Sequence, residues 1–192
     1  MAEVVILHHA QGLTPGIRDI ADEMRSAGHT VHTPDTFDGR TFDTLDDGIE
    51  YARSVGFGTL LERAVQAAQK LPADVAYLGI SLGVMAAQQL TQTRPGARGG
   101  IFLESCLPVS EFGEWPDGVP VQVHGMEGDP FFSGEGDIDA ARDLVQAVEN
   151  AELYLYPGDR HLFTDPSLNS HDPGQAALVW QRVNDFLARL DG

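Results

Sequence analysis

Short apolar runs alternate with amphipathic segments along most of the chain. Six short runs have the length of strands, and the first of them, EVVILHH, is rich in β-branched residues and suits a strand buried on both faces of a sheet. The six runs cover residues 3–9, 29–35, 75–80, 99–105, 119–126 and 151–157. Apolar residues recur at helical spacing within 16–28, 58–71, 82–93, 138–150 and 174–190. Strands separated by helices predict an α/β fold: a mainly parallel sheet of about six strands with helices on both faces.

Two stretches lack either pattern. Residues 36–48, TFDGRTFDTLDDG, are polar and contain glycine, so we expect a loop there. Residues 105–118 hold no good helical pattern, which leaves the connection between the fourth and fifth strands undefined. A length of 192 residues suits one domain with a sizeable core, and we expect a single domain over residues 1–192.

The composition narrows the range of partners. The chain has 12 Lys and Arg against 29 Asp and Glu, and its formal net charge of −17 would repel nucleic acids and anionic membranes. The beginning, MAEVVILHHAQG, has no basic segment and only a short apolar run, unlike a signal peptide or a membrane helix. The one cysteine, Cys106, forms no internal disulfide. We expect a cytoplasmic monomer or homodimer without nucleic-acid or membrane partners.

One turn contains two glycines at positions where glycine would weaken a strand or a helix. Such glycines are expected only where the backbone conformation requires them. In YLGISLGVMAAQQL (77–90), Gly79 and Gly83 flank Ser81 as G-x-S-x-G, directly after a predicted strand and directly before a predicted helix. Such a turn exposes a nucleophilic serine at a helix N-terminus, where the Leu82 N–H can face an oxyanion. The alternative is that Ser81 only caps the helix, because serine is a favoured N-cap residue.

A nucleophilic serine requires a general base, and the base requires a carboxylate that orients it. In enzymes with this serine turn, the acid and then the histidine follow the serine along the chain. Asp129 in VHGMEGDPFF and His161 in YPGDRHLF each come just after a predicted strand and fit that order. Glu104, at the end of GGIFLES, and Glu127 are alternative acids.

The first predicted strand ends in HHAQG, and the loop after it is expected to supply a second oxyanion N–H. Ala10 or Gln11 would donate it. His8 and His9 point to opposite sides if the strand continues, so one of them can line the pocket. The histidines do not form a metal motif, because neither H-E-x-x-H nor paired cysteines occur. We therefore expect no metal and no cofactor.

The chain resembles the dienelactone hydrolase family of α/β-hydrolases in LGISLG, VHGMEGDPFF, YPGDRHLF and PDTFDGRTFDT, and the resemblance runs over nearly its whole length. It implies a minimal α/β-hydrolase without a lid domain. It also implies a triad of Ser81, Asp129 and His161, and an oxyanion hole formed by the N–H groups of Ala10 and Leu82.

Two departures from the family pattern bear on the substrate. Serine stands where dienelactone hydrolases proper use cysteine, and serine suits ordinary ester chemistry. The stretch after His161 reads HLFTDP, with Asp165 and no base to hold the carboxylate of a dienelactone. We expect a cofactor-independent hydrolase of small esters, lactones or thioesters that works through an acyl-enzyme on Ser81. The alternatives are a non-catalytic binding protein, or an acyltransferase or peptidase of the same fold.

The loops also contain the residues expected to bind the substrate. No insertion is long enough for a lid, so the sequence predicts a shallow pocket. Gln11 and His9 would reach it from the first loop. Its aromatic walls would come from Phe37, Phe112, Trp115, Phe131, Phe132 and Phe163, although about half of such residues ordinarily belong to the core.

Overall fold

The structure is a computed structural model that describes residues 1–190. The protein is built around one parallel sheet. Its strands are β1 (Glu3–Leu7), β2 (Thr30–His32), β3 (Ala76–Ile80), β4 (Gly99–Leu103), β5 (Val121–Met126) and β6 (Ala151–Tyr156). They lie in the order β2-β1-β3-β4-β5-β6, and every neighbouring pair is parallel. The predicted six-stranded sheet is confirmed, and each strand overlaps one of the apolar runs.

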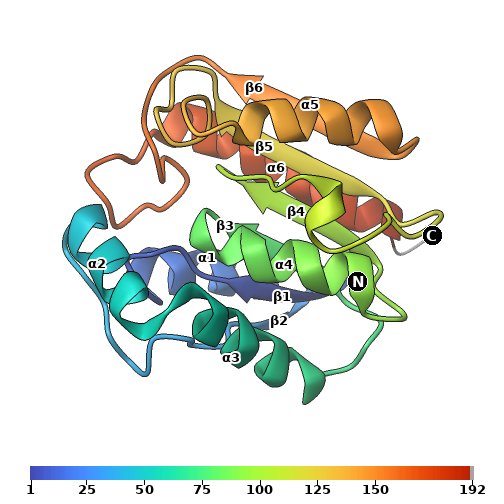
Figure 1. Ribbon diagram of the computed structural model, residues 1–192, viewed down its shortest axis with the longest axis horizontal. Helices are drawn as coiled ribbons and strands as arrows, with labels where there is room; N and C mark the ends of the chain where they lie inside the picture. The colour runs from blue at the N-terminus through green and yellow to red at the C-terminus, as the bar shows by residue number, and fades with distance from the viewer. Residues whose placement is uncertain (191–192) are drawn as a thin grey trace.

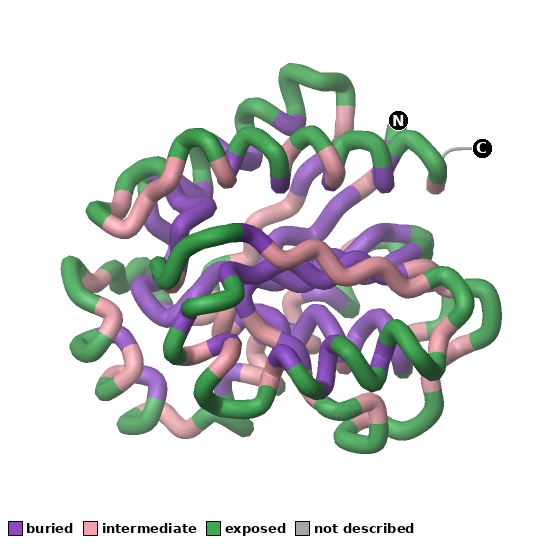
Figure 2. The backbone as a smooth tube through the Cα atoms, turned by 90° about the horizontal axis from the view of Figure 1, so that it is seen from above, coloured by how far each residue is buried: buried purple, intermediate pink, exposed green. Residues whose placement is uncertain are grey.

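Helices cover both faces of the sheet (Figure 1). One face carries α1 (Pro15–Ser26) and α6 (Pro173–Leu190), and the other carries α3 (Phe57–Gln69), α4 (Leu82–Thr93) and α5 (Asp137–Ala147). Successive strand residues point to opposite faces, so Val4 and Val5 of β1 join different core clusters. Figure 2 shows the resulting layers, with buried strands between helices whose outer sides are exposed.

One helix differs from the sequence prediction. α2 (Leu45–Val55) begins inside the stretch predicted as a loop and lies at the left of Figure 1, beside the loop that follows β6. Its first turn contains two aspartates and Gly48, a composition that is typical of a loop, although acidic residues stabilise a helix N-terminus. The glycine permits close packing on the loop after β1, since a Cβ on Gly48 would lie 2.1 Å from the Ala10 carbonyl oxygen.

The connection between β4 and β5 contains only a short 3-10 helix, Val109–Glu111, in agreement with the missing helical pattern. Within residues 1–190, no helix has the length and apolar character needed to cross a bilayer.

The strand order places a crevice between β1 and β3. From β1 the chain moves outward to β2 and then crosses back to β3 on the other side of β1. In open parallel sheets, ligands bind beyond the carboxyl ends of the strands where such a reversal occurs. The loop after β1 and the turn after β3 meet at this point, and they carry Ala10 and Ser81.

Candidate active site

The turn between β3 and α4 is strained at Ser81. Its φ of 49° and ψ of −114° are rare for a residue with a side chain, and such a conformation costs on the order of 1–3 kcal/mol. The flanking glycines let the strand and the helix pass closely. A Cβ on Gly79 would lie 2.6 Å from Val84 Cα. A Cβ on Gly83 would lie 2.1 Å from the Leu7 carbonyl oxygen. The G-x-S-x-G pattern is therefore a backbone requirement of this turn.

Three side chains from separate segments form one hydrogen-bond chain. The Ser81 hydroxyl donates to His161 Nε2 over 2.8 Å, and His161 Nδ1 lies 2.6 Å from Asp129 Oδ2. The Ser81 side chain makes no capping hydrogen bond to α4, so the structure gives it a different partner from the one that capping predicts. Asp129 is fully buried, and its Oδ1 accepts a hydrogen bond from the Phe131 N–H at 2.9 Å.

The surroundings of His161 favour its protonated form. Burial opposes a charged imidazole, but the hydrogen bond with Asp129 and the charges of Glu104, Asp129 and Asp137 outweigh burial and raise the pKa of His161. Phe131 covers the imidazole, with the two ring centroids 4.6 Å apart. An imidazole beside a hydroxyl, with a carboxylate on its other nitrogen, has the geometry of a general base.

Two backbone N–H groups beside Ser81 have no acceptor among residues 1–190. They belong to Ala10 and Leu82, and both residues line the same cavity as Ser81. The Gln11 N–H, in contrast, donates to His9 Nδ1 at 3.2 Å. Of the two donors that the first loop offers, only the Ala10 N–H is available to a ligand.

The loop after β1 is held from behind by buried polar residues. His9 Nε2 donates to Asp165 Oδ2 at 2.9 Å, and Thr14 Oγ1 donates to the same oxygen at 2.5 Å. Burial opposes the ionisation of Asp165, but hydrogen bonds such as these lower its pKa to about 2. The Gln11 side chain is buried and donates to the Phe42 carbonyl oxygen at 3.0 Å. His9 and Gln11, expected in the substrate pocket, thus support the loop and do not line the cavity.

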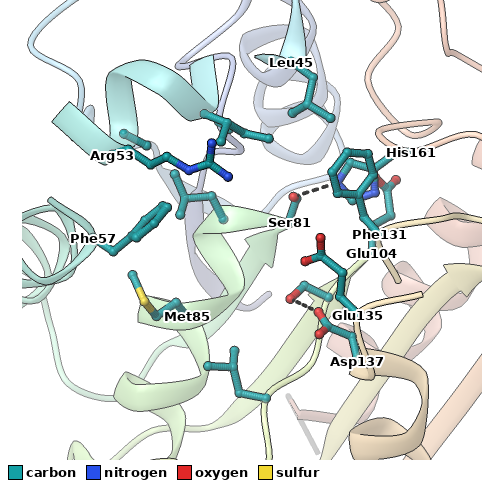
Figure 3. A pocket seen from close by; sticks show the side chains of 16 residues that line it. Leu45, Arg53, Phe57, Ser81, Met85, Glu104, Phe131, Glu135, Asp137 and His161 are labelled. Carbon is teal, nitrogen blue, oxygen red and sulfur yellow. Dashed lines mark hydrogen bonds between the residues drawn. The ribbon is translucent and has the colours of Figure 1, made fainter. Parts of the chain in front are cut away.

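A cavity of about 300 Å³ opens over Ser81 (Figure 3). One wall is mostly apolar and comes from α2, α3 and α4, with Leu45, Ile49, Ala52, Phe57, Leu82 and Met85. The opposite wall is acidic, with Glu104, Glu135 and Asp137, and Arg53 extends from α2 into the cavity (Figure 3). The sequence does not predict the α2 side chains of this wall, because it does not predict the α2 helix.

Of the aromatic residues expected around the pocket, the structure brings only Phe131 to the cavity. Phe37 is fully buried in a cluster with α2 and α3, and Phe163 is fully buried in the core beneath α1 and α6. Trp115 packs against the core on the other face of the sheet. Neither Phe112 nor Phe132 lines the cavity. Removing large rings from water is strongly favourable, which places most of them in the core.

The two alternative acids do not contact the imidazole. Glu127 is exposed and lies outside the cavity lining. Glu104 is 1% exposed, and its carboxylate accepts hydrogen bonds from the Leu162 N–H and from Thr164 Oγ1. Burial raises the pKa of Glu104 to about 7. Asp129 is the carboxylate that pairs with His161.

Comparisons with known proteins agree with this architecture. The model of the dienelactone hydrolase family matches residues 1–190. A Klebsiella pneumoniae protein assigned as a dienelactone hydrolase has 16% identity and a TM-score of 0.73, with 98% of this chain and 87% of that chain covered. A dienelactone hydrolase-like promiscuous phosphotriesterase from metagenomic libraries has 19% identity and a TM-score of 0.74, covering 99% and 87%.

Esterase 2 of Thermogutta terrifontis, phosphonylated by cyclosarin, has 15% identity and a TM-score of 0.73, covering 98% of this chain and 83% of that chain. A search among curated proteins gives no match. At these identities the solved structures establish the fold, whereas the family model spans nearly the whole chain. The chain belongs to the dienelactone hydrolase family and is a hydrolase that acts on ester bonds.

Proposed function

We propose that the protein is a serine hydrolase that cleaves small carboxylic esters, lactones or thioesters through an acyl-enzyme on Ser81. The observation that carries the proposal is the hydrogen-bond chain from Ser81 through His161 to Asp129, with links of 2.8 and 2.6 Å. A serine hydroxyl is a weak nucleophile until a base takes its proton, and this arrangement supplies the base and the group that orients it.

Acylation begins when Ser81 Oγ attacks the substrate carbonyl carbon and its proton passes to His161 Nε2. The carbonyl oxygen becomes an oxyanion, which the N–H groups of Ala10 and Leu82 stabilise. Asp129 stabilises the imidazolium and keeps Nε2 directed at the serine. The tetrahedral intermediate then collapses. His161 gives its proton to the leaving alkoxide or thiolate, and the acyl group stays on Ser81.

Deacylation repeats the sequence with water in place of the serine. His161 Nε2 takes a proton from water as the water oxygen attacks the acyl carbonyl, and the same two N–H groups hold the second oxyanion. Collapse releases the carboxylic acid and returns the proton to Ser81 Oγ. The protein's own residues account for every proton transfer, so this cycle uses no cofactor.

The cavity favours small substrates. A volume of about 300 Å³ is at the lower end of ligand pockets, and the wall from α2, α3 and α4 suits an apolar acyl or alcohol group. Two structural neighbours are described in connection with organophosphorus compounds, one as a promiscuous phosphotriesterase and one as phosphonylated by cyclosarin. This supports using an organophosphorus reagent as the first probe.

A fluorophosphonate probe tests the proposal directly. We expect a covalent adduct on Ser81, found by mass spectrometry of the digested protein, and no adduct in the Ser81→Ala variant. A folded wild-type protein that takes up no probe and cleaves no ester in a panel of p-nitrophenyl esters, lactones and thioesters would instead be a binding protein. Comparing products with and without an added alcohol separates hydrolysis from acyl transfer.

Arg53 leads to a prediction about substrate charge. Asp165 is buried away from the cavity, whereas Arg53 supplies a cationic side chain within it. We expect Arg53→Ala to raise KM for an ester with a carboxylate group by about 2- to 5-fold, because an exposed ion pair contributes up to about 1 kcal/mol. KM for a neutral ester of the same size should be unchanged. Arg63→Ala, outside the cavity, is the matched control, and equal effects on both esters would contradict the prediction.

Cysteine chemistry gives a second prediction. We expect Ser81→Cys to keep measurable activity on activated esters, well above that of Ser81→Ala, because a thiol is intrinsically more nucleophilic. Iodoacetamide should inactivate this variant and leave the wild type active. Cys106 is 1% exposed, and burial together with the charge of Asp137 raises its pKa to about 12. Loss of wild-type activity in iodoacetamide would show that Cys106 takes part in the site.

A further inference from the structure

Glu104 is a buried carboxylate at the edge of the proposed catalytic centre, and the mechanism above assigns it no step. It follows β4 directly and is 1% exposed, yet it lines the cavity together with Ser81 and His161 (Figure 3). A buried carboxylate is costly unless its surroundings satisfy it. The partners of its hydrogen bonds therefore indicate which part of the site Glu104 supports.

Both Glu104 oxygens bind the segment that follows His161. Oε2 accepts a hydrogen bond from the Leu162 N–H, and Oε1 accepts one from Thr164 Oγ1 at 3.1 Å. The first of these partners is the residue next to His161 in the chain. Glu104 thus connects the carboxyl end of a central strand to the loop that presents the imidazole.

Backbone strain concentrates at the same place. Within residues 1–190, four residues other than glycine have a positive φ, and three of them are Ser81 at 49°, Glu104 at 64° and Leu162 at 61°. Such conformations persist only where the surroundings hold them, and they cluster at functional sites. The hydrogen bond between the Glu104 carboxylate and the Leu162 N–H joins two of the three strained residues.

On these observations we propose that Glu104 is a positioning residue for His161. It holds the left-handed turn at Leu162 and so keeps the imidazole between Ser81 and Asp129. Its negative charge also supports the imidazolium that forms when His161 accepts a proton. This inference rests on the proposed serine-hydrolase function and adds to it a second carboxylate, distinct from Asp129, that acts through the backbone and through its charge.

The charges around His161 determine what removal of Glu104 should do. Asp129 faces the imidazole from the loop after β5, Glu104 from the end of β4, Asp137 from the start of α5, and His9 from the loop after β1. The three carboxylates raise the pKa of His161. Burial raises the pKa of Glu104 itself to about 7, so Glu104 adds its charge to the imidazole where it is ionised. Neutral His161 is the active base, so losing one anion should extend activity to lower pH.

Two substitutions separate positioning from charge. Glu104→Gln keeps the shape of the side chain. Its amide oxygen can accept from the Leu162 N–H while its amide nitrogen donates to Thr164 Oγ1, so both hydrogen bonds are retained. We expect it to move the acidic limb of the kcat/KM profile to lower pH by about half a unit or more, with a modest loss at the optimum. Glu104→Ala removes both hydrogen bonds. It should lower kcat by about 10- to 100-fold with little change in KM, because a misplaced base slows chemistry more than binding.

Glu127→Gln is the matched control, since it removes an exposed carboxylate outside the cavity, and its profile should equal that of the wild type. A lower melting temperature in the Glu104 variants, with kcat and the acidic limb unchanged, would overturn the inference in favour of a purely structural role. If Glu104→Ala does not fold, the Glu104→Gln variant decides by itself: an acidic limb of its kcat/KM profile at the wild-type pH overturns the inference. Full activity of Ser81→Ala would instead overturn the proposed function, so the two failures are distinguishable.

Discussion

Replacing Ser81 with alanine is expected to lower the turnover of any ester substrate by roughly 10³-fold or more. The variant lacks the proposed nucleophile but keeps the N–H groups of Ala10 and Leu82, and a proposed oxyanion hole of this kind would still give some rate enhancement. The backbone hydrogen bonds of the turn, from Ser81 N–H to Leu103 and from Val84 N–H to Ser81, do not involve the lost hydroxyl. The fold should therefore persist.

The measurement is kcat/KM on the ester that the wild type cleaves best, with circular dichroism and a thermal melt on the same sample. Ser105→Ala is the matched control, because Ser105 also lines the cavity but donates its hydroxyl hydrogen bond to Asp137 at 2.6 Å. It should keep most of the activity. Near-normal turnover in folded Ser81→Ala would contradict the triad. A large loss in Ser105→Ala would indicate that the acidic wall takes part in the reaction.

The sequence predicts those parts of the site in which the backbone dictates the residue. Gly79 and Gly83 occur where a Cβ would collide with main-chain atoms, so their spacing around a serine reports a real geometric requirement. Asp129 and His161 follow strands, and the carboxyl ends of parallel strands converge on one edge of the sheet. Residues far apart in the chain are brought together at that edge, as their placement predicts.

The cavity walls are less predictable because they depend on packing between segments. α2 keeps apolar residues at helical spacing, at Leu45, Ile49 and Ala52, but the aspartates and the glycine of its first turn have the composition of a loop. Its contacts with the loop after β1 show where it packs. Phe37 and Phe163 occur in loop sequences and are expected in the walls of the pocket, yet both are fully buried in the core. Loop conformation decides whether an aromatic ring faces a cavity or the core, and periodicity carries no information on it.

The roles of buried polar residues are a second feature of the site that the sequence does not predict. Asp165 stands close to His161 in the chain, where family resemblance places a substrate-binding base, but its partners are His9 and Thr14 behind the first loop. Glu104 is a plausible triad acid by its position after a strand. Its hydrogen bonds from the Leu162 N–H and from Thr164 Oγ1 instead connect it to the loop of the histidine. Side-chain direction separates these roles, and it emerges from the folded structure.

Asp129→Asn is expected to lower kcat on the order of 10⁴-fold while leaving the fold intact, by the precedent of serine proteases. The local hydrogen bonds give the reason. Asp129 Oδ1 accepts from the Phe131 N–H at 2.9 Å, which the amide oxygen of asparagine can do and its amide nitrogen cannot. The nitrogen of the amide must then face His161 Nδ1 and donate to it. This selects the imidazole tautomer that carries its hydrogen on Nε2, and that tautomer cannot take the proton of Ser81.

The measurement is the ratio of kcat in Asp129→Asn and in Glu104→Gln, each relative to the wild type and each with its thermal melt. Both substitutions replace one carboxylate near His161 with an amide, so they match in charge and volume. Only the first changes a direct partner of the imidazole, because Glu104 binds the following residues. We expect the Asp129 variant to be slower by orders of magnitude. If Glu104→Gln were the slower enzyme, the orienting acid would follow β4, and the 2.6 Å contact of Asp129 with His161 would have to be structural.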